Sequence, residues 1–139
     1  MPKPPAKMYE EIEHTADWAL RVRGADLSAL FSNAALGMME LAGVQTENTA
    51  GDKRKFELQA DDTETLLVDW LHELLVAVEL EQIAFRDIEL EIAGGTRLKG
   101  TVQAVPVASM DKAIKAVTFN ELDIRETSQG LEATIVFDV

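Results

Sequence analysis

Two acidic stretches near opposite ends of the sequence carry the residue types best suited to chemistry. Asp17 closes the run at residues 13–17 and directly precedes a strand-like run at residues 18–23, while Asp138 directly precedes Val139. A strand that begins or ends at a carboxylate holds it at the end of a sheet, where ligands are often bound. The alternative for Asp17 is a structural role, in which it starts the strand and accepts hydrogen bonds from nearby backbone N–H groups.

The carboxylates at the far end suit a hard metal ion. The side chain of Asp138 and the free α-carboxylate of Val139 could chelate a cation together if a third oxygen ligand came close, and Asp17 is the candidate for that ligand. The sequence has no cysteine and two histidines, which excludes thiolate sites and disfavours a multi-histidine zinc site. Calcium, magnesium or manganese is therefore the expected type of metal, and an exposed strand end without a ligand is the alternative.

Lys115 is the third residue of interest. In a strand it shares a face with Val117 and Phe119 rather than with polar side chains. Such a lysine commonly extends its stem to reach solvent. Alternatively, it could balance the charge of carboxylates such as Asp17 and Asp138.

The chain that must position these residues is expected to be one domain spanning residues 1–139. Its 139 residues are 47% apolar and 27% charged, as in ordinary soluble proteins. Three prolines make residues 1–7 an expected flexible, extended arm. No stretch resembles a signal peptide or a membrane span, so a cytoplasmic location is expected.

The charge balance narrows the possible partners. There are 13 basic and 25 acidic side chains, for a formal net charge of −12. Such a surface repels phosphate backbones, which disfavours autonomous binding of nucleic acid, and it favours a basic protein partner. The sequence also lacks a phosphate-binding glycine loop, a serine elbow and an H-E-x-x-H motif, so a conventional nucleotide-binding or hydrolytic enzyme is not supported.

Two helices are predicted. Asp26 is placed to cap the first, and Gly43 is placed to end it. The second begins near Asp61 or Asp62, and Asp61 and Glu64 have the spacing of a capping box. It carries a wide apolar face that consists of Leu66, Leu67, Trp70, Leu71, Leu74, Leu75 and Val78. His72 is expected on its wet flank as a surface residue.

Strands are predicted on both sides of these helices, with a hairpin turn at Gly94-Gly95. The expected strands are residues 8–12, 18–23, 53–60, 84–92, 97–105, 113–120 and 131–139. Residues 45–52 and 107–112 are expected loops, and residues 122–125 are expected to continue the preceding strand past a bulge. The order of elements predicts an α+β fold of two layers, with two main helices packed on one face of a mixed, largely antiparallel sheet.

Taken together, four separated blocks of the sequence resemble the archease family. They are residues 13–17 (EHTAD), 66–75 (LLVDWLHELL), 114–119 (IKAVTF) and 136–139 (VFDV). Their order and spacing, and the length of the chain, match that family, so the resemblance covers nearly the whole sequence. The family often has a histidine where this chain has Asn120, and an asparagine where it has His72.

The resemblance implies an accessory protein of the RtcB-type RNA ligase rather than an enzyme. Such a protein promotes guanylylation and multiple turnover of the ligase in tRNA splicing and RNA repair. The family's metal site, usually described with calcium, corresponds here to Asp17, Asp138 and the terminal carboxylate of Val139, and its functional lysine corresponds to Lys115. A stand-alone metal-dependent phosphoesterase and a chaperone-like protein-binding module are the alternative functions.

Overall fold

The computed structural model describes residues 8–12 and 18–139. One sheet contains β1 (Tyr9–Ile12), β2 (Trp18–Gly24), β7 (Ala116–Thr118), β8 (Arg125–Thr127) and β9 (Gly130–Asp138). The other contains β3 (Gln45–Thr46), β4 (Asp52–Gln59), β5 (Ile83–Ala93) and β6 (Arg97–Ser109). The helices are α1 (Leu27–Leu41), α2 (Thr63–Val76) and the π-helical turn η1 (Ala77–Glu81).

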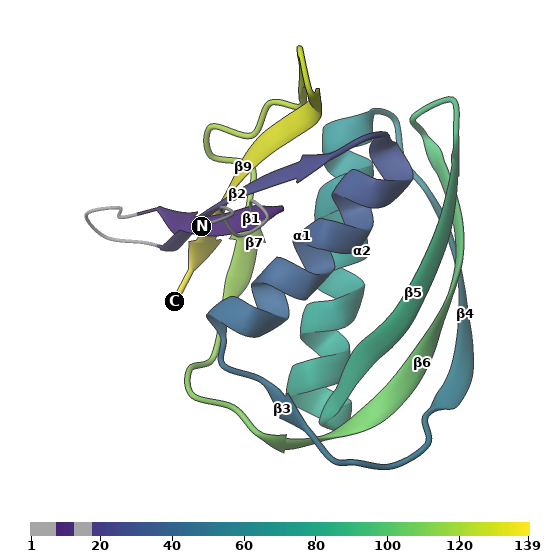
Figure 1. Cartoon of the computed structure of the whole chain (residues 1–139), viewed down its shortest axis with the longest axis vertical. Coiled ribbons are helices and arrows are strands. Elements are labelled where there is room, and N and C mark those ends of the chain that lie inside the picture. Colours follow the sequence, from purple (N-terminus) through teal and green to yellow (C-terminus); the bar gives the residue numbers. More distant parts are fainter. Residues whose placement is uncertain (1–7, 13–17) are drawn as a thin grey trace, which may run out of the picture.

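The predicted α+β class is confirmed, but the strands form two sheets rather than one. The order is β1-β2-β9-β7 in the first sheet, with β8 also paired to β9, and β3-β6-β4 in the second, with β5 also paired to β6. Each pairing between described strands is antiparallel. The helices lie between the two sheets (Figure 1). Alternating burial along a strand is the same for either arrangement, so the pattern that predicted one sheet could not reveal the second.

Both helices begin at an aspartate that caps exposed N–H groups. Asp26 accepts a hydrogen bond from the amide of Ala29 at 2.8 Å, as the sequence predicted. In α2 the cap is Asp62, which accepts from the amide of Thr65 at 2.7 Å, so the predicted capping box at Asp61 is wrong. This bond to a main-chain N–H holds the pKa of Asp62 below its ordinary value, because the charged carboxylate is the better acceptor.

α2 does not end as an ordinary helix. It continues into η1, and Gln82 then adopts a left-handed conformation with φ 56°. The guanidinium of Arg54 on β4 donates two hydrogen bonds to Glu81, both 3.0 Å long, and these lower the pKa of that carboxyl. The end of the helical segment is thereby fastened to the second sheet.

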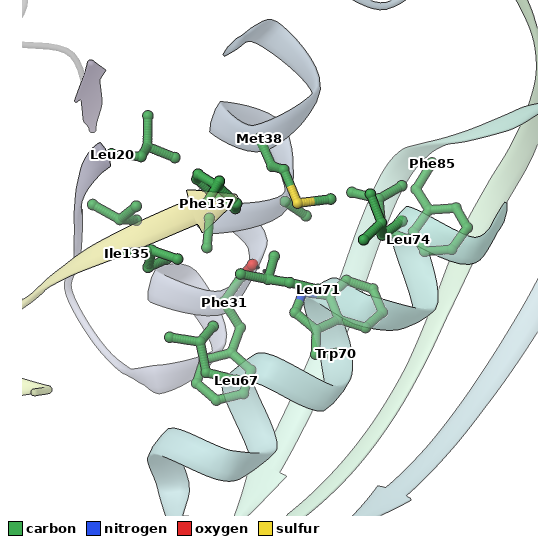
Figure 2. Close-up of a cluster of buried hydrophobic side chains, with 14 of the residues drawn as sticks. Leu20, Phe31, Met38, Leu67, Trp70, Leu71, Leu74, Phe85, Ile135 and Phe137 are labelled. Carbon is green, nitrogen blue, oxygen red and sulfur yellow. Dashed lines mark hydrogen bonds between the residues drawn. The ribbon is translucent and has the colours of Figure 1, made fainter. Parts of the chain in front are cut away.

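The core lies where α1 and α2 face each other and the sheets. All seven residues of the predicted apolar face are buried, six of them on α2 and Val78 on η1. Trp70 is fully buried, its Nε1 donates to the carbonyl of Phe31 on α1 at 3.0 Å, and its ring contacts Phe56 and Phe85 of the second sheet. Figure 2 shows Ile135 and Phe137 of β9 joining the same cluster, so β9 packs directly on the helical layer.

Two segments predicted as loops contain strand. Residues 45–52 include β3 and the first residue of β4, and β6 extends through Val107 to Ser109. The two extensions pair with each other, since Gln45 lies opposite Ser109. Both were hard to predict, because a short and largely exposed strand buries little apolar surface and shows no clear alternation.

The predicted strand at residues 113–120 is much shorter in the structure, where β7 covers Ala116–Thr118. Residues 122–125 do not continue it past a bulge. The chain leaves the sheet after Thr118 and returns as a separate strand, β8, which also pairs with β9. Among the described helices, none combines the length and apolar character required to cross a membrane.

Candidate functional site

The end of β9 is held from both sides. Phe137 lies opposite Trp18 on β2 and opposite Val117 on β7. Asp138 lies opposite Ala116, and its main-chain carbonyl accepts a hydrogen bond of 2.7 Å from the amide of Lys115. The backbone that carries Asp138 is therefore fixed by the sheet rather than frayed.

Asp138 combines this fixed backbone with an accessible side chain. Phe137 is fully buried, whereas Asp138 is exposed and Val139 is half-buried. Neighbouring side chains point to opposite faces of the sheet, and on the face of Asp138 the burial ends with Val136, which is 1% exposed, so Asp138 is exposed where the strand ends. The carboxylate is thus presented to solvent on a rigid support.

Lys115 lies directly before β7, and its backbone is bonded to the backbone of Asp138. Its neighbour Ile114 is 2% exposed and belongs to the core, whereas the side chain of Lys115 is exposed. Of the two residues predicted to share its face, Val117 packs partly against the core and Phe119 is 55% exposed. The structure therefore brings Lys115 and Asp138 together through the backbone and leaves both side chains accessible.

Asp17 lies outside the described residues, as do Glu13 and His14. Trp18, which follows Asp17 in the sequence, pairs with Phe137, which precedes Asp138. The prediction that Asp17 joins Asp138 and Val139 in one site remains a prediction.

The donor groups at the end of β9 suit a hard cation. Carboxylate oxygens are the preferred ligands of calcium and magnesium, and Asp138 offers them without a competing ion pair to any described residue. Within residues 8–12 and 18–139, no group of three acidic or histidine side chains could hold a metal ion. A complete coordination shell therefore requires donors beyond those side chains.

One contact near this site was not predicted. The ammonium of Lys112 lies 4.0 Å from the centroid of the Trp18 ring, which is a cation–π contact. The two residues are far apart in the sequence, and Lys112 lies at the tip of a segment predicted as a loop, so no periodic pattern pointed to it. The contact could be identified only from the three-dimensional structure, in which Trp18 is placed by the pairing of β2 with β9.

The residues that depart from the family pattern lie on the surface. His72 is exposed on α2, as predicted. Asn120 is exposed just beyond β7, and its amide donates to the hydroxyl of Thr118 at 3.2 Å. That hydroxyl in turn donates to the carbonyl of Val136 at 3.0 Å, so the turn after β7 is tied to β9.

A hollow lies elsewhere on the described surface, over the second sheet. It measures about 510 Å³ and lies over β4, β5 and β6, where its charged lining residues are Lys55, Glu57, Glu89, Glu91 and Lys99. Glu57 and Lys99 form an ion pair of 3.6 Å across two of these strands. Mixed charges of this kind are typical of a solvated sheet face, so the end of β9 remains the stronger candidate.

Comparison with known proteins gives a consistent result. A sequence model described as the archease protein family matches residues 9–139. The chain is 34% identical to protein archease of Methanosarcina barkeri, over 96% of this chain and 97% of the relative. It is 31% identical to protein archease of Archaeoglobus fulgidus, over 94% of this chain and 98% of the relative.

Two solved structures share the fold. The solution structure of Methanobacterium thermoautotrophicum protein 1598 superposes with a TM-score of 0.74 at 28% identity, covering 96% of this chain and 100% of that protein. The crystal structure of an archease from Thermotoga maritima, described as a possible chaperone, superposes with a TM-score of 0.70 at 23% identity, covering 100% of this chain and 98% of that protein.

Proposed function

The chain belongs to the archease protein family, and from this premise we propose that it is a metal-binding activator of an RtcB-type RNA ligase. In this role it promotes guanylylation of the ligase and its multiple turnover in tRNA splicing and RNA repair. The observation that supports the proposal is the end of β9, where the backbones of Lys115 and Asp138 are joined by a hydrogen bond and both side chains are exposed.

The proposed ligands are Asp17, Asp138 and the α-carboxylate that Val139 carries when it is the last residue. The proposed cation is calcium or another hard divalent ion such as magnesium or manganese. When bound, such an ion neutralises crowded carboxylates and offers a partly open coordination position to an oxygen ligand of the partner. The fixed backbone of Asp138 favours binding, because that donor loses little conformational freedom when a cation binds.

Lys115 has a separate proposed role as an accessible cation. Its ammonium can donate up to three hydrogen bonds, to a carboxylate or a phosphate of the ligase and its bound nucleotide. Because the amide of Lys115 is bonded to the carbonyl of Asp138, the backbones that carry the cation and the carboxylate are held together.

The overall charge fits a protein partner better than RNA alone. With a net charge of −12, the chain repels free RNA, whereas a basic surface on the ligase would attract it. RNA therefore enters this proposal through the ligase, and a cytoplasmic location remains an expectation.

The test is ligase–guanylate formation with an RtcB-type ligase, the divalent ion and GTP. We expect Asp138→Asn and Lys115→Met to lower the rate at least about tenfold, as when a charge that contacts a partner is removed. Asp69→Asn and Lys53→Met are matched controls, because both residues are exposed and belong to other elements, α2 and β4. Equal activation by all four variants would refute the site.

Metal binding is measured separately by luminescence of terbium, a calcium substitute excited through tryptophan. We expect weaker binding by Asp17→Asn and Asp138→Asn, and by a chain extended beyond Val139, because the extension converts the α-carboxylate into an amide. Unchanged affinity in the extended chain would remove Val139 from the ligand set.

The alternative functions give different results in the same assays. A phosphoesterase hydrolyses phosphate esters without the ligase and loses that activity in Asp138→Asn. A chaperone-like module, the role suggested for the Thermotoga maritima protein, suppresses aggregation of unrelated proteins and is insensitive to Asp138→Asn. Either result without ligase activation would replace the proposed function.

A further inference from the structure

The segment at residues 110–115 leads from β6 to Lys115 and contains no helix or strand. We propose that Lys112 is a positioning residue, whose contact with Trp18 holds this segment across the first residue of β2 and thereby fixes Lys115 beside the end of β9. The importance of Lys115 rests on the proposed function, whereas the fastening of the segment can be tested without it.

The first fastening joins the segment to the end of α1. The amides of Asp111 and Lys112 both donate to the carbonyl of Ala42, at 3.0 Å and 3.1 Å. Ala42 caps α1, and Gly43 follows with φ 67°, a left-handed conformation that favours glycine. A Cβ on Gly43 would lie 2.2 Å from Oδ2 of Asp111, so the absence of a side chain there permits this close approach.

The second fastening is the contact between Lys112 and Trp18. The lysine backbone is held by Ala42, and its ammonium reaches the indole ring at 4.0 Å. Trp18 is itself held, because it pairs with Phe137 in the centre of the first sheet. At a partly exposed site, such a contact changes a local equilibrium by a factor of about 2–5.

The third fastening lies at the other end of the segment. Ile114 is 2% exposed in the core, and the amide of Lys115 donates to the carbonyl of Asp138 at 2.7 Å. The segment is therefore attached to α1, to β2 and to β9 in the space of a few residues. Loops normally move more than the elements they join, so three attachments at a loop that ends in Lys115 suggest that its position matters.

The test compares two replacements of Lys112. Lys112→Met keeps most of the apolar stem and removes the charge, whereas Lys112→Arg keeps a cation that can stack on the indole ring. Lys53→Met is the matched control for loss of an exposed lysine, because Lys53 lies on β4 in the other sheet.

The first readout is hydrogen exchange of the Lys115 amide. We expect this exchange to be about 2–5-fold faster in Lys112→Met. The reason is that loss of the contact raises the equilibrium constant for local opening of the segment by the same factor. Exchange in the middle of β9, for example at Ile135, stays unchanged, and Lys112→Arg restores slow exchange at Lys115. Equal acceleration at Ile135, or none at Lys115, overturns the proposal.

The second readout is ligase–guanylate formation. We expect Lys112→Met to lower the rate by a similar factor, Lys112→Arg to restore it and Lys53→Met to leave it unchanged. If the wild-type chain does not activate the ligase, the proposed function fails, and the exchange measurement still decides the fastening. If the wild type activates and Lys112→Met does so equally despite faster exchange at Lys115, the positioning role is overturned and the proposed function stands.

Discussion

Tyr9 is the single tyrosine of the chain, and its hydroxyl donates a hydrogen bond to the carboxylate of Glu40 on α1. This bond, together with partial burial and the negative charge of Glu40, raises the pKa of Tyr9 from 10.0 to about 12. Because no other tyrosine absorbs, the phenolate signal in an alkaline titration reports this one group. We predict a titration midpoint near 12 and a lower midpoint, closer to 10, in Glu40→Gln.

The same shift has a consequence for stability. The folded chain holds the phenolic proton more tightly than the unfolded chain, so this stabilisation is complete below pH 10 and is lost as the pH rises to about 12. Glu11→Gln, at an exposed carboxylate on the same strand, is the control and should leave the midpoint unchanged. A wild-type midpoint at the ordinary value would contradict the hydrogen bond.

Single residues with a local physical reason were the easiest to predict from sequence. Asp26 caps α1 and Gly43 adopts a left-handed conformation, as expected of an aspartate before a helix and a glycine after one. The prediction of Asp61 as the cap of α2 failed because either of two adjacent aspartates could fill that position. The local sequence does not determine which of them lies at the helix start. Lys112 could not be found, because its contact with Trp18 depends on the tertiary arrangement of two segments that are far apart in the sequence.

At the scale of elements, α2 depends on one large buried side chain. Trp70 fills space between α1 and the second sheet and donates a hydrogen bond to the carbonyl of Phe31. We predict that Trp70→Phe lowers the free energy of unfolding by about 2–3 kcal/mol, because it leaves a small cavity and removes that bond. Denaturant unfolding measures the change.

The matched control is Trp18→Phe, which makes the same substitution at a half-buried ring. It should lower the free energy of unfolding by less than about 1 kcal/mol, since less apolar surface leaves the core. A larger loss at Trp18 than at Trp70 would contradict the burial of these two side chains.

The elements themselves were predictable in proportion to the apolar surface they bury. The helices and the long strands show regular spacing of apolar residues, and their existence is confirmed. β3 and β8 are short and exposed, so their sequences contain no such pattern. The turn η1 was missed for another reason, because its residues suit an ordinary helix and only the attachment of Glu81 to Arg54 distinguishes its end.

For the candidate site, the sequence could identify groups but not distances. Asp138 and Lys115 were selected for their chemistry, and the structure brings their backbones together through a register that composition does not contain. The number of sheets could not be predicted for the same reason. It depends on which strands pair, and paired strands can lie far apart in the sequence.

For the whole molecule, the net charge of −12 implies repulsion among like charges in the folded state. Raising the ionic strength from about 0.01 M to about 0.15 M shortens the screening length from about 30 Å to about 8 Å. We predict a gain in stability on the order of 1 kcal/mol, equivalent to about 4 °C in the midpoint of thermal unfolding. Calorimetry at the two ionic strengths measures it.

A double variant on α2 tests whether repulsion between like charges causes this salt dependence. Asp69 and Glu73 are exposed one helical turn apart on α2, where like charges repel. Replacing them with asparagine and glutamine should raise the unfolding midpoint at low salt and reduce its dependence on salt. If salt lowers the midpoint of the wild type, favourable ion pairs outweigh the repulsion.

The position of β9 between β2 and β7 also affects how the protein is made. β2 is the second of the described strands to be synthesised, and its partner β9 is the last of them. At a synthesis rate of about 5–20 residues per second, β9 is made on the order of 10 s after β2. During synthesis the second sheet can close first, since β4, β5 and β6 are complete earlier, and the sheet that carries Asp138 is completed only once β9 has been made.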